Sequence, residues 1–169
     1  MALANVFDNF HQNEVFQKET KFLAWNAHSS INGNHLTSFN DELTSRKVNF
    51  HEAMKVATHV FVTFGSAWGY YHQELRQVVA NCHKMPQNLF EKKLSGIEEI
   101  VVKWTEIIKS YPSIQWIFTV SPVRHWKDGV RENNVSKGVL HQSIHELLKL
   151  DNVSYFPSYE IIMDELRDY

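Results

Sequence analysis

The chain has 169 residues, of which 43% are hydrophobic and 21% are charged, and its formal net charge is -2 at pH 7. This length suits one domain with a sizeable core, and the small net charge gives no support for nucleic acid or an anionic membrane as a partner. Cys82 is the only cysteine, so an internal disulfide is excluded and a reducing, cytoplasmic location is favoured. No apolar run is long enough to span a bilayer, and the first ten residues lack the pattern of a secretory signal.

Residues 1–49 are polar, with weak periodicity and many Asn, His and Ser residues. One short strand is predicted at residues 21–25, followed by a loop. A connection of that length without periodicity is uncommon inside a compact domain. We therefore expect a weakly structured, loop-rich entry over residues 1–49 and a regular α/β core over residues 50–169, within a single domain.

From Asn49 onward the pattern alternates regularly between strands and helices. Asn49 is predicted to cap a helix at residues 50–57, Ser95 a helix to residue 110 through a capping box with Glu98, and Ser136 a helix to residue 149. A last helix is predicted at residues 160–166. The predicted strands are residues 59–64, 77–81, 115–120 and 153–156. This alternation is typical of an α/β fold with a parallel sheet.

Polar stretches follow three of these strands, at residues 65–66, 81–84 and 121–125. In open parallel sheets, ligands bind in the crevice beyond the carboxyl ends of the strands. If the strands are parallel, Gly65, Asn81 and Arg124 are therefore expected to lie near one another, at one edge of the sheet.

Three long blocks resemble the GSCFA family: VVANCHKMP (78–86), FTVSPVRHWKDGVRENNVSK (118–137) and YFPSYEIIMDELRDY (155–169). VTFGSAWGYY (62–71) is similar to that family's strand-plus-glycine block, and AWNAHSS (24–30) is a weaker match to its Trp/His/Ser-rich loop. The resemblance implies a three-layer, flavodoxin-like parallel sheet of the SGNH-hydrolase type. It also implies a relation to enzymes that cleave esters or remove acyl groups with a Ser-His-Asp triad.

The chain departs from the family pattern in two places. The Gly-Ser-Cys-Phe-Ala stretch, whose Ser is the presumed nucleophile, is absent, and no DxxH block follows the RDY stretch at residues 167–169. We therefore expect a partial domain, incomplete at both ends and inactive alone, related to hydrolases of small-molecule esters or acylated carbohydrates. The alternative is a non-catalytic module that binds carbohydrate or protein. A missing first strand would leave a sheet edge exposed, which makes self-association a further expectation.

The resemblance implies Gly65 and Asn81 as donors to an oxyanion. A plain turn glycine and a strand-end Asx turn are the respective alternatives. His83 is interpreted either as a base or, since it stands beside a lysine, as a surface residue or a supporting hydrogen-bond partner. Cys82 has no activating neighbours in sequence and is interpreted as a small buried hydrophobe rather than a nucleophile.

Arg124 and His125 are candidates for a substrate loop, because a guanidinium and an imidazole suit acyl or phosphoryl groups. The alternative is that Arg124 braces Asp128 or Glu132 while His125 caps the loop. Loop architecture and helix capping are the interpretation for the remaining polar residues of this block, namely Asp128, Asn133, Asn134, Ser136 and Lys137. The spacing of His28 and His35 matches no standard zinc site, and no phosphate-binding glycine motif occurs, so neither a metal nor a cofactor is predicted.

Overall fold

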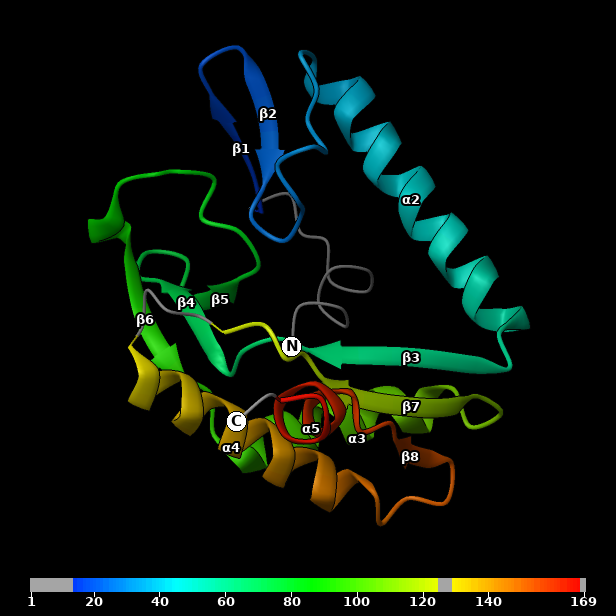
Figure 1. The fold of residues 1–169 in the computed structure, drawn as a ribbon. Coiled ribbons are helices and arrows are strands. Elements are labelled where there is room, and N and C mark those ends of the chain that lie inside the picture. The colour runs from blue at the N-terminus through cyan, green and yellow to red at the C-terminus, as the bar shows by residue number, and fades with distance from the viewer. Residues whose placement is uncertain (1–13, 125–128, 168–169) are drawn as a thin grey trace. The chain divides into compact units, whose positions relative to one another are not determined.

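The computed structural model describes residues 14–124 and 129–167. The chain is a mixed α/β protein and forms two compact units (Figure 1). The first unit comprises Met1–Val56 and Gly69–Lys93, and the second comprises Ala57–Trp68 and Leu94–Tyr169. The expectation of a single domain stays a prediction.

The second unit contains a parallel three-stranded sheet in the order β3-β7-β8. β3 (His59–Phe64) pairs with β7 (Gln115–Val120) from His59↔Gln115 to Phe64↔Val120, and β7 pairs with β8 (Val153–Tyr155). α3 (Ile97–Ser110) precedes β7, and α4 (Val130–Leu147) connects β7 to β8. The predicted strands at residues 59–64 and 115–120 and their parallel direction are confirmed.

One face of this sheet forms the core of the second unit. Phe118 is fully buried, and Trp104 of α3 meets its ring edge-on, with ring centroids 5.1 Å apart. The Trp104 ring also contacts Phe64 of β3 at 5.5 Å. The helical spacing of Ile100, Trp104 and Ile108 places them along the buried side of α3, which contacts α4. Burying such large rings supplies much of the hydrophobic stabilisation of this unit.

The opposite face of the sheet is open at β3, where the Phe61 side chain is 65% exposed and Thr63 is also exposed. At β7, Thr119 is buried on this face and its hydroxyl hydrogen-bonds the hydroxyl of Ser158. Ser158 begins α5 (Ser158–Glu160), which continues as the π-helical turn η4 (Ile161–Glu165). The second unit thus has a helical layer on one face of its sheet, and this short helix lies beside β7.

The first unit contains a hairpin, a long helix and most of a three-stranded sheet. β1 (Val15–Lys18) pairs antiparallel with β2 (Lys21–Ala24), and α2 spans Leu36–Val56. β4 (Trp68–His72) lies between β5 (Gln77–Val79) and β6 (Phe90–Leu94), which follows the short 3₁₀ helix η2 (Gln87–Leu89). A small core gathers Phe39 of α2 against Ala24 and Ala27.

Several predicted boundaries are wrong. α2 begins at Leu36, so Asn49 lies inside the helix, and the predicted loop does not extend over residues 36–49. The helix over residues 36–49 was not predicted because only Phe39 and Met54 of the 21 residues of α2 are buried, so the sequence shows no apolar stripe at helical spacing. β4 and β6 were not predicted, since β6 carries charged side chains at three exposed positions, Glu91, Lys92 and Lys93.

Two predicted caps are also wrong. The N-cap of α3 is Gly96 rather than Ser95. α4 begins at Val130, so Ser136 lies within the helix instead of at its start.

In the described part of the chain, none of the helices combines the length and the apolar character needed to cross a bilayer.

Candidate functional site

A buried lysine joins the carboxyl ends of β3 and β7 in the second unit. Lys137 of α4 is 3% exposed, and its Nζ donates hydrogen bonds of 2.7 Å to the carbonyl oxygens of both Gly65 and Ser121. Burial lowers the pKa of Lys137 below its ordinary value. The residues that follow the two strands are therefore fixed to each other by one side chain.

Ser136, the neighbour of Lys137 on α4, holds the next residues of the same loop. Its hydroxyl oxygen accepts a 2.7 Å hydrogen bond from the Ala67 N–H and lies 3.2 Å from the Ser66 hydroxyl oxygen. Ser66 in turn accepts a bond from the Trp68 N–H at 3.0 Å. The loop after β3 thus has a defined conformation, supported by α4.

Gly65 lies at the start of this loop. Two structural reasons for a glycine at this position are a positive φ and a lack of space for a Cβ. Gly129 is the described glycine with a positive φ, of 93°, so the conformation of Gly65 is open to any residue. Apart from its two chain neighbours, no described residue has a heavy atom within 4 Å of a Cβ built on Gly65, whereas one built on Gly33 would meet Phe39 at 3.0 Å. Neither backbone conformation nor packing requires glycine at position 65, and space lies beside its Cα.

Arg124 is exposed, and its Nη2 lies 3.9 Å from the Met163 sulfur. The alternative partner Glu132 lies 3.4 Å from Arg131 Nη1. His125 and Asp128 lie outside the described residues. The substrate-loop role of Arg124 and His125 therefore stays a prediction.

Asn81 forms a polar turn in the first unit. Its Oδ1 accepts a 2.8 Å hydrogen bond from the His83 N–H, which is the Asx turn expected as an alternative. Its Nδ2 donates to the Ser29 hydroxyl at 3.0 Å, within the loop that resembles the Trp/His/Ser-rich block. Beside it, His28 Nδ1 lies 2.8 Å from the Ser30 hydroxyl.

His83 is 5% exposed and is held firmly from several sides. Its Nε2 lies 2.7 Å from the Ala24 carbonyl oxygen, which can only accept, so the Nε2 proton is donated there. Nδ1 is then a buried lone pair, with no hydrogen-bond partner among the described residues. Burial lowers the pKa of His83, which favours the neutral ring. Lys18 Nζ fixes the turn by donating to the His83 carbonyl at 2.8 Å.

Cys82 lies between these two residues and is half-buried. Burial raises the pKa of its thiol, which disfavours the nucleophilic thiolate.

The structure brings some candidates together. Gly65, Ser121 and Lys137 meet in the second unit, whereas Asn81 and His83 belong to the first. β5, the strand before Asn81, pairs antiparallel with β4 in a separate sheet, so the expectation that Asn81 follows a strand of the same parallel sheet as Gly65 is wrong. The convergence of Gly65, Asn81 and Arg124 stays a prediction. The anchoring role of Lys137 was missed because α4 was expected to start at Ser136; a helix starting at Val130 puts Lys137 on the buried stripe with Leu140 and Ile144.

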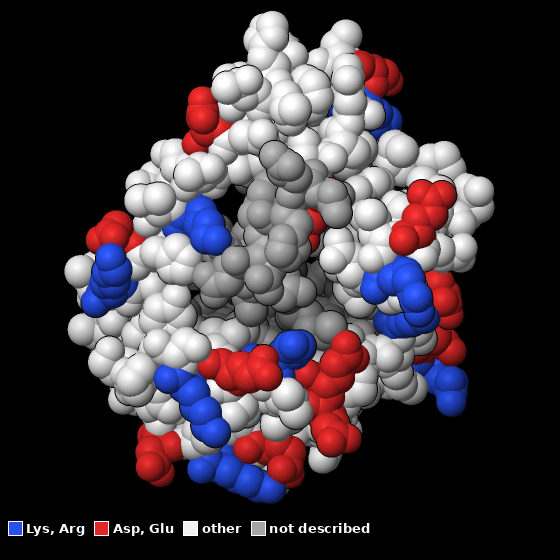
Figure 2. All heavy atoms as spheres, turned by 180° about the vertical axis from the view of Figure 1, so that it is seen from behind, with Lys and Arg blue, Asp and Glu red and all other residues white. Residues whose placement is uncertain are grey.

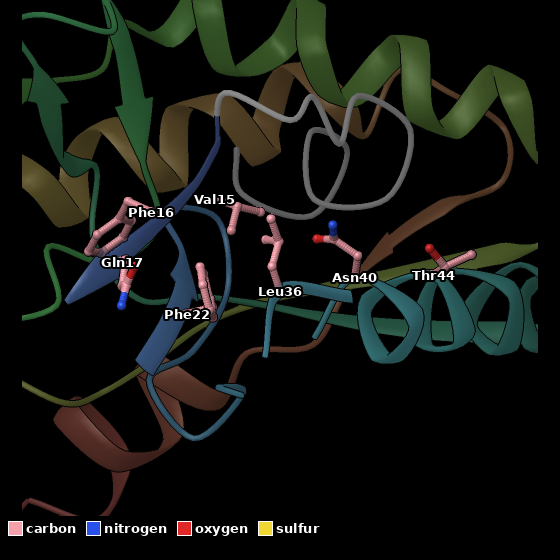
Figure 3. Close-up of a pocket in the computed structure, with 7 residues that line it drawn as sticks. All are labelled: Val15, Phe16, Gln17, Phe22, Leu36, Asn40 and Thr44. Carbon is pink, nitrogen blue, oxygen red and sulfur yellow. The ribbon is translucent and has the colours of Figure 1, made fainter. Parts of the chain in front are cut away.

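Two cavities flank α2 in the first unit. Figure 3 shows one of about 440 Å³, lined by Val15, Phe16, Gln17, Phe22, Leu36, Asn40 and Thr44. The other, of about 670 Å³, lies against the loop at residues 26–31 and is lined by Asn26, Ala27, His28, Ile31, Leu43, Thr44, Arg46, Lys47, Asn49 and Phe50. Both are half-open to solvent and are lined by polar as well as apolar side chains.

Charges of both signs are mixed on the face shown in Figure 2, without a large area of one sign. Over residues 14–124 and 129–167, no group of three or more His, Cys, Asp or Glu residues is arranged to hold a metal ion.

The protein belongs to the α/β class, because it combines a parallel sheet with helices. Polar residues lie at the carboxyl ends of β3 and β7, which is where open parallel sheets usually bind ligands. The model of the GSCFA family matches residues 1–169, and the chain belongs to that family. Comparison with curated proteins gave no match, and neither did comparison with solved structures.

Proposed function

We propose that this GSCFA chain is related to SGNH-type ester or acyl hydrolases and supplies the oxyanion side and the substrate loop of such a site. The proposal includes a flavodoxin-like arrangement of the sheet. The observation that carries it is the environment of Gly65, a residue at the carboxyl end of a parallel strand. Its carbonyl is anchored by Lys137, and no described residue other than its chain neighbours comes within 4 Å of a Cβ built there.

The chemistry of acyl transfer explains why such a glycine is useful. When a nucleophile attacks an ester carbonyl, the carbonyl oxygen gains negative charge, and donors already in place stabilise it. A glycine lets the reacting carbonyl approach the backbone closely. Because Lys137 fixes the peptide between Gly65 and Ser66, the Ser66 N–H needs little reorganisation when the charge develops.

Asn81, in the first unit, is proposed separately as a donor to an oxyanion. An amide nitrogen carries two hydrogens, and the bond to Ser29 uses one of them. The Asx turn holds the side chain in one conformation, so it can serve structure and binding together. His83, neutral and with its Nδ1 lone pair, is suited to accept a proton or a hydrogen bond.

Calorimetric titration with methylphosphonate, a small mimic of a tetrahedral oxyanion, tests the proposal. We expect weak, saturable binding that Gly65→Ala reduces at least about tenfold, because the new methyl group occupies the space beside Cα. Gly138→Ala is the matched control, since a Cβ there also meets open space and its φ is not in the left-handed range. Equal binding by all three proteins would refute the role of Gly65.

A second candidate is a binding module without catalysis, favoured by the cavity of about 670 Å³ in the first unit. Its aromatic and amide lining, with Phe50 and Asn49, suits a carbohydrate. A cello-oligosaccharide titration separates the two functions. Binding that is lost in Phe50→Ala and retained in Gly65→Ala supports the module, and the absence of binding to this oligosaccharide counts against a carbohydrate-binding module of this kind.

A further inference from the structure

Outside the proposed site, the outer edge of β3 is the feature that most directly indicates an interaction surface. In the order β3-β7-β8, β3 is an edge strand of the described sheet. Its sequence, HVFVTF, contains no Asp, Glu, Lys, Arg or Pro. Natural edge strands usually carry such residues, because an unprotected edge pairs with another strand. β3 lacks that protection over its whole length.

The hydrogen bonds of the strand show which residues face this edge. The Phe64 carbonyl accepts from the Ser121 N–H, and the Thr58 carbonyl accepts from the Gln115 N–H, so even-numbered residues direct their backbone groups toward β7. His59, Phe61 and Thr63 therefore direct theirs to the outer edge. The side chains of the same three residues lie on the open face of the sheet and are exposed.

We propose that the outer edge of β3 is a dimerisation surface, where β3 of a second copy of this chain pairs antiparallel about a two-fold axis at Phe61. In this register Phe61 lies opposite Phe61 of the other copy, and His59 lies opposite Thr63. All three outward-facing residues then form hydrogen-bonded pairs, which is the pattern of an antiparallel ladder. A two-fold axis makes the interface self-complementary.

Side-chain chemistry supports a second copy rather than an unrelated strand. The Phe61 side chain is 65% exposed, and the register brings two such rings together across the axis, where aromatic cross-strand pairs are favourable. On the other face, Val60 lies opposite Val62 of the second copy, continuing the apolar layer. No charged side chain of β3 opposes another, so the strand matches itself.

The test measures association of the full 169-residue chain by light scattering over a range of concentrations. We expect a dimer whose dissociation constant rises at least about tenfold in Phe61→Lys, because two lysines then face each other. Thr63→Pro tests the backbone: the Thr63 N–H points outward, so proline removes an intermolecular bond and no bond to β7. Val102→Lys, at an exposed position of α3, is the control and should dimerise normally.

Disulfide trapping tests the register. In a Cys82→Ser background, Phe61→Cys should cross-link two chains under oxidising conditions, since Cα atoms of a hydrogen-bonded pair lie about 5.5 Å apart. Val102→Cys should not. A wild-type chain that stays monomeric at the highest concentration overturns the proposal. So does a dimer that persists unchanged in Phe61→Lys and Thr63→Pro, or equal cross-linking by the two cysteine variants.

Discussion

Replacing Lys137 by methionine tests the anchoring of the loops after β3 and β7. Methionine has a similar length but cannot donate, so the carbonyls of Gly65 and Ser121 both lose a charge-assisted hydrogen bond of 2.7 Å. Such bonds contribute about 1.5–3 kcal/mol each, or about 3–6 kcal/mol together. The substitution also removes the unfavourable burial of a charge, which offsets part of that loss. We expect a net decrease of about 2–3 kcal/mol in the free energy of unfolding.

Urea unfolding followed by circular dichroism measures this change, with Lys109→Met as the control at an exposed lysine of α3. The control should lie within about 0.5 kcal/mol of the wild type. If Lys137→Met also lies within that range, Lys137 does not hold the two strands and the reasoning fails.

The pH dependence supplies a second readout of the same lysine. Burial lowers the pKa of Lys137, so the unfolded chain keeps this proton to a higher pH than the folded chain does. Over that interval the unfolded state binds more protons, and stability rises with pH. The stability difference between wild type and Lys137→Met should therefore grow as the pH rises from neutral toward about 10.4. A difference that shrinks would contradict the argument.

Three further predictions concern the first unit and the chemistry. Asn81→Ala removes the bonds to the Ser29 hydroxyl and the His83 N–H and should cost about 1–2 kcal/mol in urea unfolding, whereas Asn81→Asp, which keeps the acceptor, should cost less. Because burial lowers the pKa of His83, the unfolded chain takes up this proton before the folded chain does as the pH falls through about 6.5. The free energy of unfolding should therefore decrease in this range more in the wild type, and in the exposed control His35→Gln, than in His83→Gln. Equal pH profiles for the three proteins would contradict this. The 169-residue chain should not hydrolyse p-nitrophenyl acetate above the buffer rate, and turnover that Asn81→Ala abolishes would overturn that expectation.

The sheet of the second unit was predictable because its signals are local and strong. Residues 59–64 and 115–120 are uninterrupted β-branched and aromatic runs, and α3 carries a clear apolar stripe, so chain order and strand direction followed. α2 escaped prediction for the opposite reason, since a helix with Phe39 and Met54 as its buried residues has almost no periodic pattern.

The site was predictable only in part. Gly65 and Asn81 were proposed from the blocks around them, and their roles stay predictions; the Asx turn of Asn81, expected as its alternative, follows from ordinary local chemistry. The anchoring by Lys137 could not be read from the sequence, because it depends on where α4 begins and on contacts across 72 residues of chain. Long-range bonds of this kind are set by packing, which local propensity does not encode.

The central claim is that the carboxyl edge of β3 and β7 receives the oxyanion of an acyl substrate. A heteronuclear NMR titration of the isotope-labelled chain with methylphosphonate tests it most directly, because each backbone amide reports separately. We expect saturable shifts concentrated at the amides of Gly65, Ser66 and Ser121, and their loss in Lys137→Met. Shifts confined to Asn49 and Phe50 at the cavity beside α2, or no shifts at any concentration, would contradict the account.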